Sequence, residues 1–369
     1  MTRLLELYGR YGQSPWIDNI RRDWLEDGTL AALVRDGVRG VTSNPSIFAK
    51  ALATSDAYDD RIARVGRGGD VEAVFEALAV EDVRDACDVL APVHLASHDE
   101  RESGRRRYLD GFVSLEVSPR LAHDGAATVD AARRLAGAVG RPNLMVKIPA
   151  TREGLPAVSA VLAEGINVNV TLIFSVERYV AVVDAWMAGL EAALAAGRNI
   201  AEIASVASFF VSRVDTAVDA ALAPGDPRRG TTAIHQAAAA YRAYRGAVAS
   251  ERADVLLRAG AQVQRPLWAS TSVKNPDYDE LLYVDNLVGD ETDNTMPDAT
   301  LNAAGQRGRF ERSLLRDAPS TMRAADAFDR LGEEVDLASI TDRLEVEGVK
   351  AFVDSYEEVL ATVAAKAAP

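Results

Sequence analysis

Residues 143–154, NLMVKIPATREG, contain an apolar run that is interrupted by one lysine, Lys147. Pro149 and Gly154 follow the lysine, so the run is typical of a short buried strand that enters a loop. Burial disfavours the charged ammonium form of a lysine. A neutral amine attacks carbonyl carbons and forms a Schiff base. The alternative is a lysine that extends from the strand end to solvent, and this stretch alone favours that alternative.

Further apolar runs lie on both sides of this strand and alternate with longer helical segments. The other predicted strands cover residues 14–18, 40–44, 111–117, 167–174, 203–211, 266–270 and 281–288. Helices are expected over residues 71–97, 126–139, 155–164, 175–196, with Ser175 as a cap, 231–259 and 320–365, and a loop over residues 289–304.

Eight strands that alternate with helices predict parallel strands with helical crossovers, and hence an α/β fold. The count suggests a closed (β/α)8 TIM barrel. An open doubly wound sheet is the competing architecture, but no GxGxxG motif follows the first strand. We expect a single barrel domain over residues 1–369, in which residues 305–369 form a helical C-terminal extension packed on the barrel.

Composition indicates which partners to expect. The chain of 369 residues has 48% hydrophobic residues, 26% charged residues and a net charge of −14. This acidic balance disfavours nucleic acid and anionic membranes as partners. Cys87 is the only cysteine, which fits a reducing cytoplasm, and neither a signal peptide nor a membrane span is recognisable. The oligomeric state stays open between monomer and homodimer.

Polar residues stand at the ends of the predicted strands, where the barrel fold places catalytic groups. They are Asp18, Asn44, Glu116, Lys147, Asn169, Thr171, Ser208 and Ser270, with Arg213 shortly after Ser208. This set provides one amine nucleophile, two carboxylates, neutral hydrogen-bonding groups and a cation. The four histidines fall in helices or loops without the spacing of metal ligands, and no P-loop is present. We therefore expect neither a metal nor a nucleotide cofactor.

A structural alternative exists for each of these residues. Asp18 could be a helix N-cap, and Asn44 could be a turn residue before Pro45. Glu116 could form an ion pair with Arg120. Thr171 could be an ordinary strand residue, and Arg213 could lie on a helix surface. Their joint placement at consecutive strand ends favours the interpretation that they form a functional site.

The sequence resembles the transaldolase family. The lysine segment LMVKIPATREGL is similar to the Schiff-base signature of that family. Further similar blocks are WID at Asp18, TSNPSIF at Asn44, VSLEVSPRLAHD at Glu116, NVNVTLIFS at Thr171 and ASFFVSRVD at Ser208 and Arg213. They occur in family order from Asp18 to about Lys274, which covers most of the chain.

The resemblance implies a cofactor-free transaldolase of the pentose phosphate pathway. Lys147 would form the Schiff base with fructose 6-phosphate or sedoheptulose 7-phosphate, and an aldose phosphate such as glyceraldehyde 3-phosphate or erythrose 4-phosphate would accept the dihydroxyacetone unit. Asp18 would be the acid/base at the C4 hydroxyl, while Glu116 and Thr171 would hold a water. Asn44, Asn169 and Ser208 would bind the dihydroxyacetone unit, and Arg213 and Ser270 the phosphate.

The sequence departs from the family pattern at the phosphate site. The arginine expected shortly after Ser270 is absent, and Lys274 is the nearest cation. A fructose-6-phosphate aldolase on the same barrel is the nearest alternative, but such relatives tend to have Gln in place of Glu116 and Tyr in place of Phe210. A non-catalytic barrel that only binds sugar phosphate is a second alternative, although it would have no use for Lys147.

Overall fold

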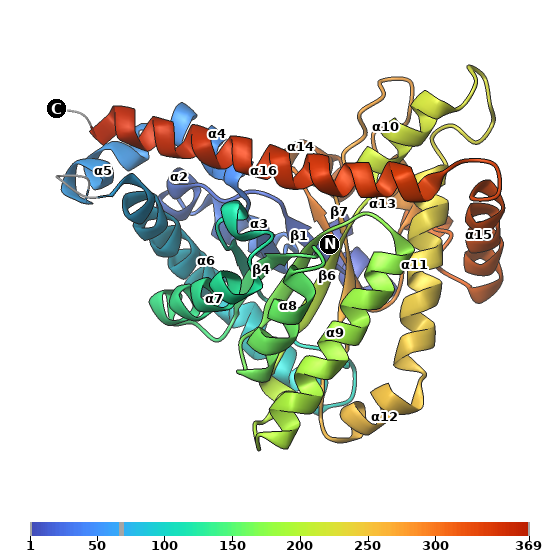
Figure 1. The fold of residues 1–369 in the computed structure, drawn as a ribbon, viewed down its shortest axis with the longest axis horizontal. Helices are drawn as coiled ribbons and strands as arrows, with labels where there is room; N and C mark the ends of the chain where they lie inside the picture. Colours follow the sequence, from blue (N-terminus) through green and yellow to red (C-terminus); the bar gives the residue numbers. More distant parts are fainter. Residues whose placement is uncertain (1, 66–69, 368–369) are drawn as a thin grey trace.

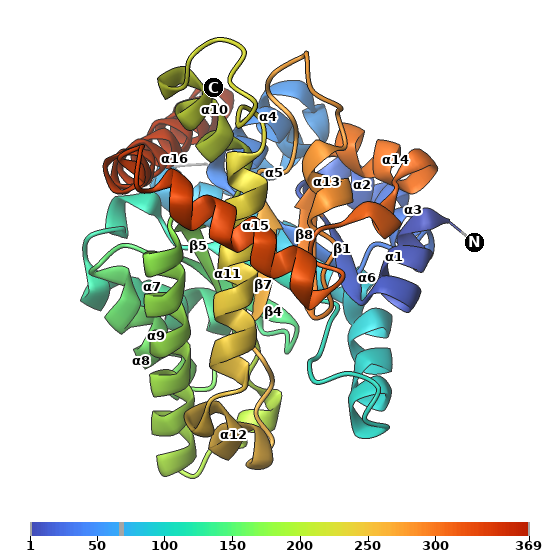
Figure 2. The same ribbon diagram turned by 90° about the vertical axis from the view of Figure 1, so that its right-hand side faces the viewer.

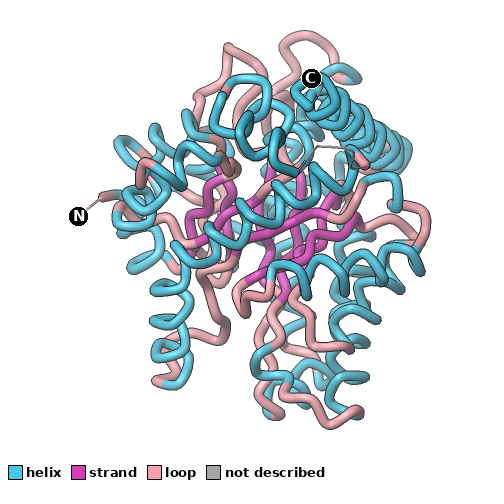
Figure 3. The backbone as a smooth tube through the Cα atoms, turned by 90° about the vertical axis from the view of Figure 1, so that its left-hand side faces the viewer, coloured by secondary structure: helices cyan, strands magenta, loops and turns pink. Residues whose placement is uncertain are grey.

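The fold is that of a computed structural model, which describes residues 2–65 and 70–367. Within these residues, parallel strands close into a barrel in the order β1 to β8. The strands lie at the centre of the molecule (Figures 1 and 3). The strands are β1 (Gln13–Ile17), β2 (Gly40–Thr42), β3 (Val113–Glu116), β4 (Leu144–Pro149), β5 (Val168–Ile173), β6 (Ser205–Phe210), β7 (Arg265–Ala269) and β8 (Thr292–Met296). The predicted α/β class and closed (β/α)8 barrel are confirmed.

Helices surround the barrel and occupy the connections between strands (Figure 3). They are α1 (Arg3–Tyr11), α2 (Arg22–Glu26), α3 (Thr29–Arg35), α4 (Pro45–Thr54), α5 (Asp59–Val65), α6 (Val71–Glu102), α7 (Gly125–Val139), α8 (Gly154–Ala163), α9 (Val176–Ala195), α10 (Ser212–Ala221), α11 (Thr232–Val248), α12 (Glu251–Arg258), α13 (Leu282–Asn286), α14 (Asp298–Arg307), α15 (Ala318–Leu331) and α16 (Leu337–Ala367). None of these described helices combines the length and apolarity needed to cross a membrane.

Serine caps determine where two of these helices begin. The Oγ of Ser175 accepts a hydrogen bond from the backbone N–H of Arg178 at 3.0 Å, so the predicted cap of α9 is confirmed. The single helix predicted over residues 231–259 is wrong, because α11 ends at Val248. Ser250 caps a separate helix, α12, by accepting from the N–H of Ala253 at 3.2 Å. Serine favours such positions because its hydroxyl satisfies an N–H that has no partner within the helix.

The prediction of the eighth strand was wrong. Residues 281–288 are apolar enough for a strand, yet Leu282–Asn286 forms the short helix α13. Buried polar contacts hold this helix: the hydroxyl of Tyr283 donates to Asp215 at 2.9 Å, and the carboxylate of Asp285 accepts from the N–H of Arg309 at 2.7 Å. The true β8 lies in the segment predicted as a loop, and α14 follows it.

Strand β8 has a polar sequence, TDNTM, because its inward side chains meet polar partners inside the barrel. Asp293 forms an ion pair with the buried Arg265 of β7. The hydroxyl of Thr295 lies 2.6 Å from the hydroxyl of Thr42 on β2. Buried charges are tolerated when they are paired, so this strand needs no apolar sequence to be buried.

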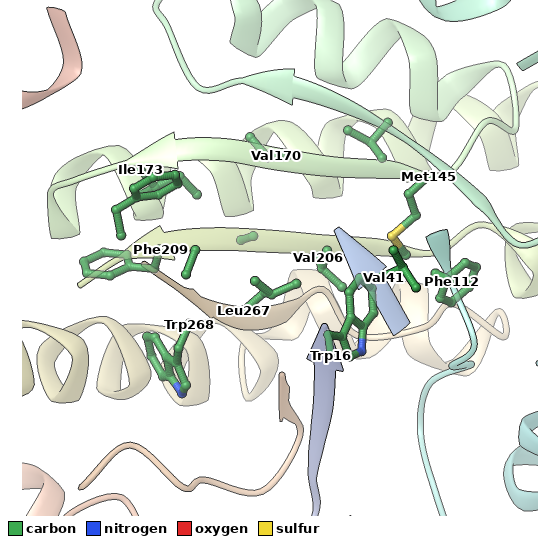
Figure 4. Close-up of a cluster of buried hydrophobic side chains, with 14 of the residues drawn as sticks. Trp16, Val41, Phe112, Met145, Val170, Ile173, Val206, Phe209, Leu267 and Trp268 are labelled. Carbon is green, nitrogen blue, oxygen red and sulfur yellow. The ribbon is translucent and has the colours of Figure 1, made fainter. Parts of the chain in front are cut away.

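The outer face of the barrel is apolar and fixes the direction of the inner side chains. Phe209 of β6 packs edge-on against Tyr179 of α9 and Trp268 of β7, with ring centroids 6.1 Å apart in each pair. Figure 4 shows Phe209 and Trp268 among the buried hydrophobic side chains. Aromatic pairs of this kind contribute about 0.5–1.5 kcal/mol beyond the area that they bury. Because side chains alternate along a strand, the outward Phe209 leaves Ser208 and Phe210 on the opposite face.

The long helix α16 lies across the C-terminal end of the barrel (Figure 1). It approaches β5 closely at Gly348, where a Cβ atom would lie 3.2 Å from both Leu172 and Phe174. The ion pair between Arg178 and Glu345, at 3.1 Å, ties α16 to α9. The C-terminal helix therefore covers the end of the barrel at which the predicted site residues lie.

Candidate active site

Lys147 is buried inside the barrel with only 4% of its surface exposed. Its Nζ donates a hydrogen bond to the backbone oxygen of Ser43 at 3.1 Å and lies 3.6 Å from Oε2 of Glu116. The ring centroid of Phe352, on α16, lies 5.7 Å from the same nitrogen. The alternative of a lysine that extends to solvent is therefore wrong, and the amine lies in an enclosed, partly aromatic environment.

The strand register brings the neighbours of Lys147 together. Lys147 on β4 pairs with Glu116 on β3 and with Asn169 on β5, so the three residues lie side by side across the barrel wall. Asn169 lies between two hydroxyls: its Nδ2 donates to Ser114 at 3.0 Å and its Oδ1 accepts from Ser208 at 2.7 Å. The lysine thus has a carboxylate on one side and, on the other, an amide that is oriented by one hydrogen bond at its nitrogen and one at its oxygen.

Glu116 is buried, with 5% of its side chain exposed. Burial raises its pKa from the ordinary 4.5 to about 7, the charge of Lys147 opposes this shift, and the charge of Asp18 adds to it. A carboxyl group with a pKa near neutrality exchanges protons readily at physiological pH. The predicted alternative of a pair with Arg120 is wrong, because Arg120 contacts Glu357 and Glu72 instead.

Asp18 immediately follows β1 and is the second carboxylate of the site. Its Oδ1 accepts a hydrogen bond from the hydroxyl of Thr42 at 2.6 Å. Burial raises its pKa, whereas the charge of Lys147 and the hydrogen bond from Thr42 oppose the shift. Asp18 does not cap the next helix, whose N-cap is Arg21. Its carboxylate is therefore available to a ligand in the barrel.

Thr171 lies two residues after Asn169 on β5, so both side chains point to the same face. A bulge follows it, because the register with β6 shifts between Val170 and Ile173 and Leu172 has a φ of 59°. Positive φ is strained for a leucine, and such strain is common at functional sites. Among the described residues, neither the buried Oγ1 of Thr171 nor Oε2 of Glu116 has a hydrogen-bond partner. These two atoms flank the lysine strand from both sides.

Asn44 has a structural role as well as a place near the site. Its Oδ1 accepts from the N–H of Ile47 at 3.0 Å, so it is the N-cap of α4. The preceding residue, Ser43, provides the carbonyl oxygen that binds the lysine amine. The side-chain oxygen of Asn44 is thus engaged by the helix, and the side-chain N–H groups of Asn44 are the donors that remain for other partners.

Ser270, Arg213 and Lys274 form a second, cationic group at the strand ends. The Oγ of Ser270 lies 2.9 Å from the Oγ of Ser212, the first residue of α10, and Ser270 has a φ of 55°. Arg213 lies over the ring of Phe210 at 5.6 Å, and burial lowers its pKa. Neither Arg213 nor Lys274 forms an ion pair with a carboxylate of the described residues. Two unneutralised cations beside a helix N-terminus provide a site for an anion.

Three groups near the lysine were not predicted from the sequence. They are the hydroxyl of Thr42, the carbonyl oxygen of Ser43 and the ring of Phe352. Thr42 and Ser43 belong to the TSNPSIF block, in which only Asn44 was singled out. Phe352 lies in a helix far along the chain, and no sequence signal connects it with the lysine.

The raised pKa of Glu116 predicts a pH-dependent change in stability. Between about pH 4.5 and pH 7 the folded carboxyl retains a proton that the unfolded chain has released, because its pKa rises from 4.5 to about 7. This group therefore destabilises the fold as pH rises. Relative to wild type, Glu116→Gln should gain roughly 2 kcal/mol of unfolding free energy between pH 5 and pH 8.

Urea unfolding of both proteins at several pH values measures this difference. Glu358→Gln, which changes an exposed glutamate on α16, is the matched control and should show no such gain. A constant difference between wild type and Glu116→Gln across the pH range would contradict the raised pKa.

Comparisons with known proteins agree with this geometry. The model of the transaldolase/fructose-6-phosphate aldolase family matches residues 15–363. A transaldolase from Thermobifida fusca is 50% identical over 361 residues, which is 96% of this chain and 95% of the relative. A transaldolase from Thiobacillus denitrificans is 48% identical over 96% of this chain and 98% of the relative. A transaldolase from a Parafrankia strain is 47% identical over 98% of both chains. The chain belongs to the transaldolase/fructose-6-phosphate aldolase family.

Proposed function

We propose that this transaldolase transfers a dihydroxyacetone unit from a ketose phosphate to an aldose phosphate through a Schiff base on Lys147. The donor would be sedoheptulose 7-phosphate or fructose 6-phosphate, and the acceptor glyceraldehyde 3-phosphate or erythrose 4-phosphate. The observation that carries the proposal is the buried amine of Lys147 with a carboxylate 3.6 Å away. No metal or organic cofactor takes part in these steps.

Schiff-base formation begins when the neutral amine of Lys147 attacks the ketone carbon of the donor. The resulting carbinolamine loses its hydroxyl group as water, which requires a proton from a nearby acid. Glu116, with a pKa of about 7, is suited to give and take this proton. Among the described residues, neither Oε2 of Glu116 nor Oγ1 of Thr171 has a hydrogen-bond partner. These two oxygens lie on the strands on either side of β4, which supports a role for both in holding the water of this step.

Carbon–carbon cleavage follows in the bound ketose. Asp18 takes the proton of the C4 hydroxyl, the C3–C4 bond breaks, and its electron pair moves into the protonated imine to give an enamine. The aldose phosphate leaves, and an acceptor aldehyde then forms a new bond at C3 as Asp18 returns the proton. The raised pKa of Asp18 supports this role, since a stronger base accepts the hydroxyl proton more readily.

Two groups of residues are suited to bind the two ends of the substrate. Asn169 and Ser208, on β5 and β6, offer hydrogen bonds to the hydroxyls of the dihydroxyacetone unit, together with the amide N–H groups of Asn44. Arg213, Ser270 and Lys274 would hold the phosphate. Lys274 would act as a point charge, whereas Arg213 can bind two phosphate oxygens at once.

Cys87, the only cysteine of the chain, is buried, which is compatible with a reducing compartment. We therefore place the reaction in the cytoplasm.

We also infer a single domain over residues 1–369, with residues 305–369 as a C-terminal extension. In support, α16 packs on the barrel, although α14 runs across the proposed boundary to Arg307.

Arg213→Ala should raise the KM for phosphorylated sugars about ten- to a hundredfold. The loss of a charge-assisted hydrogen bond costs roughly 1.5–3 kcal/mol, which corresponds to this range. Steady-state kinetics with fructose 6-phosphate and with unphosphorylated fructose measure the effect. Only the phosphorylated substrate should respond, and Lys274→Ala is the matched comparison, with a smaller expected effect. An equal loss on both substrates would show that Arg213 supports the fold rather than the phosphate.

A fructose-6-phosphate aldolase would release dihydroxyacetone instead of transferring it. Release requires that C3 of the enamine takes up a proton and that water then attacks the resulting imine, and Phe210 offers that water no hydrogen bond. Phe210 lies on the same strand face as Ser208, packs against Phe174 with centroids 5.1 Å apart and is 6% exposed. Glu116 and Phe210 stand where aldolase relatives tend to have Gln and Tyr, so both residues favour transfer.

Phe210→Tyr adds a hydroxyl on this face and should raise the release of free dihydroxyacetone relative to transfer. The measurement compares dihydroxyacetone formed from fructose 6-phosphate without acceptor with the transfer rate when acceptor is present. An unchanged ratio in a folded variant would mean that Phe210 only packs against its neighbours and that another residue controls the outcome.

Borohydride reduction in the presence of fructose 6-phosphate, followed by intact mass, tests whether the protein forms a Schiff base or only binds sugar phosphate. The wild-type enzyme should gain one dihydroxyacetone-derived adduct. A barrel that only binds sugar phosphate would gain none.

A further inference from the structure

A cavity of about 540 Å³ opens at the N-terminal end of the barrel. Its walls come from the residues before β1 and β8 and from α11 and α15, which cross one another in Figure 2. Gly12 directly precedes β1 and Asp290 lies just before β8, so the cavity is at the end of the barrel away from the strand ends that carry the active site. Small-molecule sites typically have volumes of about 300–1,000 Å³.

The lining of this cavity is rich in arginine. Its charged residues are Arg10, Arg106, Arg242, Arg245, Arg316, Asp290 and Asp317. Cations therefore outnumber carboxylates in the lining, although the whole chain has a net charge of −14. A local excess of positive charge within an acidic protein attracts small anions to that place.

Two of these arginines are already neutralised by nearby carboxylates. Arg242 donates to Asp326 at 3.1 Å and to Asp329 at 2.8 Å, which ties α11 to α15. Arg10 pairs with Glu6 one turn earlier on α1, at 3.2 Å. These contacts explain Arg242 and Arg10 as structural residues.

The other three arginines have poorly satisfied guanidinium groups. Arg245 lies 3.7 Å from Glu291, whose two oxygens already accept hydrogen bonds from Arg107 at 2.6 Å each. Arg106 lies 3.9 Å from Asp290 and donates one hydrogen bond, to the backbone oxygen of Tyr8 at 3.0 Å. Arg316 forms no ion pair with any described residue, and its guanidinium lies over the ring of Tyr11 at 4.3 Å. A guanidinium has five N–H donors, so most of the donors of these arginines remain available to a ligand.

The two carboxylates of the lining have different roles. Asp317 caps α15, since its Oδ1 accepts from the N–H of Ser320 at 2.8 Å, so it is occupied. The side chain of Asp290 lies against Gly12 and is 61% exposed. Its backbone oxygen accepts from the hydroxyl of Tyr241 at 3.0 Å, and its carboxylate lies 3.9 Å from Arg106 in the lining of the cavity. A carboxylate beside an anion site accepts hydrogen bonds from the hydroxyls of the same ligand.

We propose that this cavity binds the phosphate ester of a polyol at a site separate from the active site. Arg106, Arg245 and Arg316 would hold the phosphate, since guanidinium groups match phosphate oxygens in pairs. The carboxylate of Asp290 would accept the hydroxyls of the polyol. This ligand class satisfies both the remaining guanidinium donors and the carboxylate in one pocket, whereas inorganic phosphate would offer Asp290 no hydroxyl groups of a polyol.

Hydrogen–deuterium exchange with glucitol 6-phosphate tests the proposal, because this probe has no carbonyl group and forms no Schiff base. In the full-length wild-type protein, the probe should slow exchange in the segments around Gly12 and Tyr241. The double variant Arg245→Ala/Arg316→Ala should lose this protection and bind the probe at this site at least tenfold more weakly, with transaldolase kcat and KM unchanged. Arg312→Ala, an exposed arginine outside the lining, is the matched control and should retain protection.

Absence of protection at these segments, or protection that survives in the double variant, would overturn the site. Asp290→Asn separates the two parts of the ligand: it should weaken glucitol 6-phosphate at least threefold and leave inorganic phosphate unaffected or bound more tightly. Equal protection by inorganic phosphate, unchanged by Asp290→Asn, would overturn the polyol part. Because these segments contain none of the residues assigned to the reaction, the result is independent of the proposed mechanism.

Discussion

Lys147→Ala is expected to show no measurable transfer of dihydroxyacetone and no borohydride-trapped adduct. Every chemical step proposed here passes through the amine of this residue, so no other group can partly replace it. The variant should still fold. Without the lysine charge, which opposes the rise in the pKa of Glu116, that carboxyl group becomes a weaker acid and is buried in its neutral form. The penalty of an unpaired buried charge is then avoided.

Intact mass after reduction, followed by peptide mapping, provides the measurement. Lys274→Ala is the matched control, because it removes the other lysine near the strand ends and should still give an adduct. An adduct in Lys147→Ala on another lysine would refute the assignment. Wild-type protein that turns over fructose 6-phosphate without ever giving an adduct would refute the Schiff base itself.

The sequence was most informative where one physical signal dominated. Strands β1 to β7 were predicted close to their positions because short apolar runs and flanking turn residues coincide there. The lysine strand was the clearest case, since Lys147 is the one charge within an apolar run. Strand β8 was missed because its inward residues, Asp293 and Thr295, are polar and are stabilised by Arg265 and Thr42. Hydropathy cannot reveal partners that are distant in sequence.

The same limit applies to the site. The expectation that polar residues at the strand ends form the site grouped Glu116, Lys147 and Asn169, and the strand register places them side by side. The ring of Phe352 beside the lysine was not predictable, because its position depends on how α16 packs across the barrel end. That packing is a tertiary contact between Gly348 and β5, and a single glycine in a helical pattern does not indicate it.

Asp18→Ala is expected to slow transfer by about 10²–10⁴, the usual contribution of a general acid/base. The loss should fall on carbon–carbon cleavage, because Asp18 is proposed to act on the C4 hydroxyl and not on the ketone. Borohydride should therefore still trap an adduct at Lys147, and the trapped species should be the intact ketose rather than its three-carbon fragment. Intact mass distinguishes the two, since they differ by the mass of the departing aldose phosphate.

Asp298→Asn is the matched control for this prediction. Asp298 lies close enough to raise the pKa of Asp18 by its charge. Both carboxylate oxygens of Asp298 accept from Nδ2 of Asn19, each at 3.0 Å. Its replacement removes a nearby negative charge without removing the proposed base, so transfer should change far less than in Asp18→Ala. Two results would contradict the role of Asp18: near wild-type turnover in Asp18→Ala, or accumulation of the three-carbon adduct. The second would show that cleavage proceeds without Asp18 and that the residue acts on a later step.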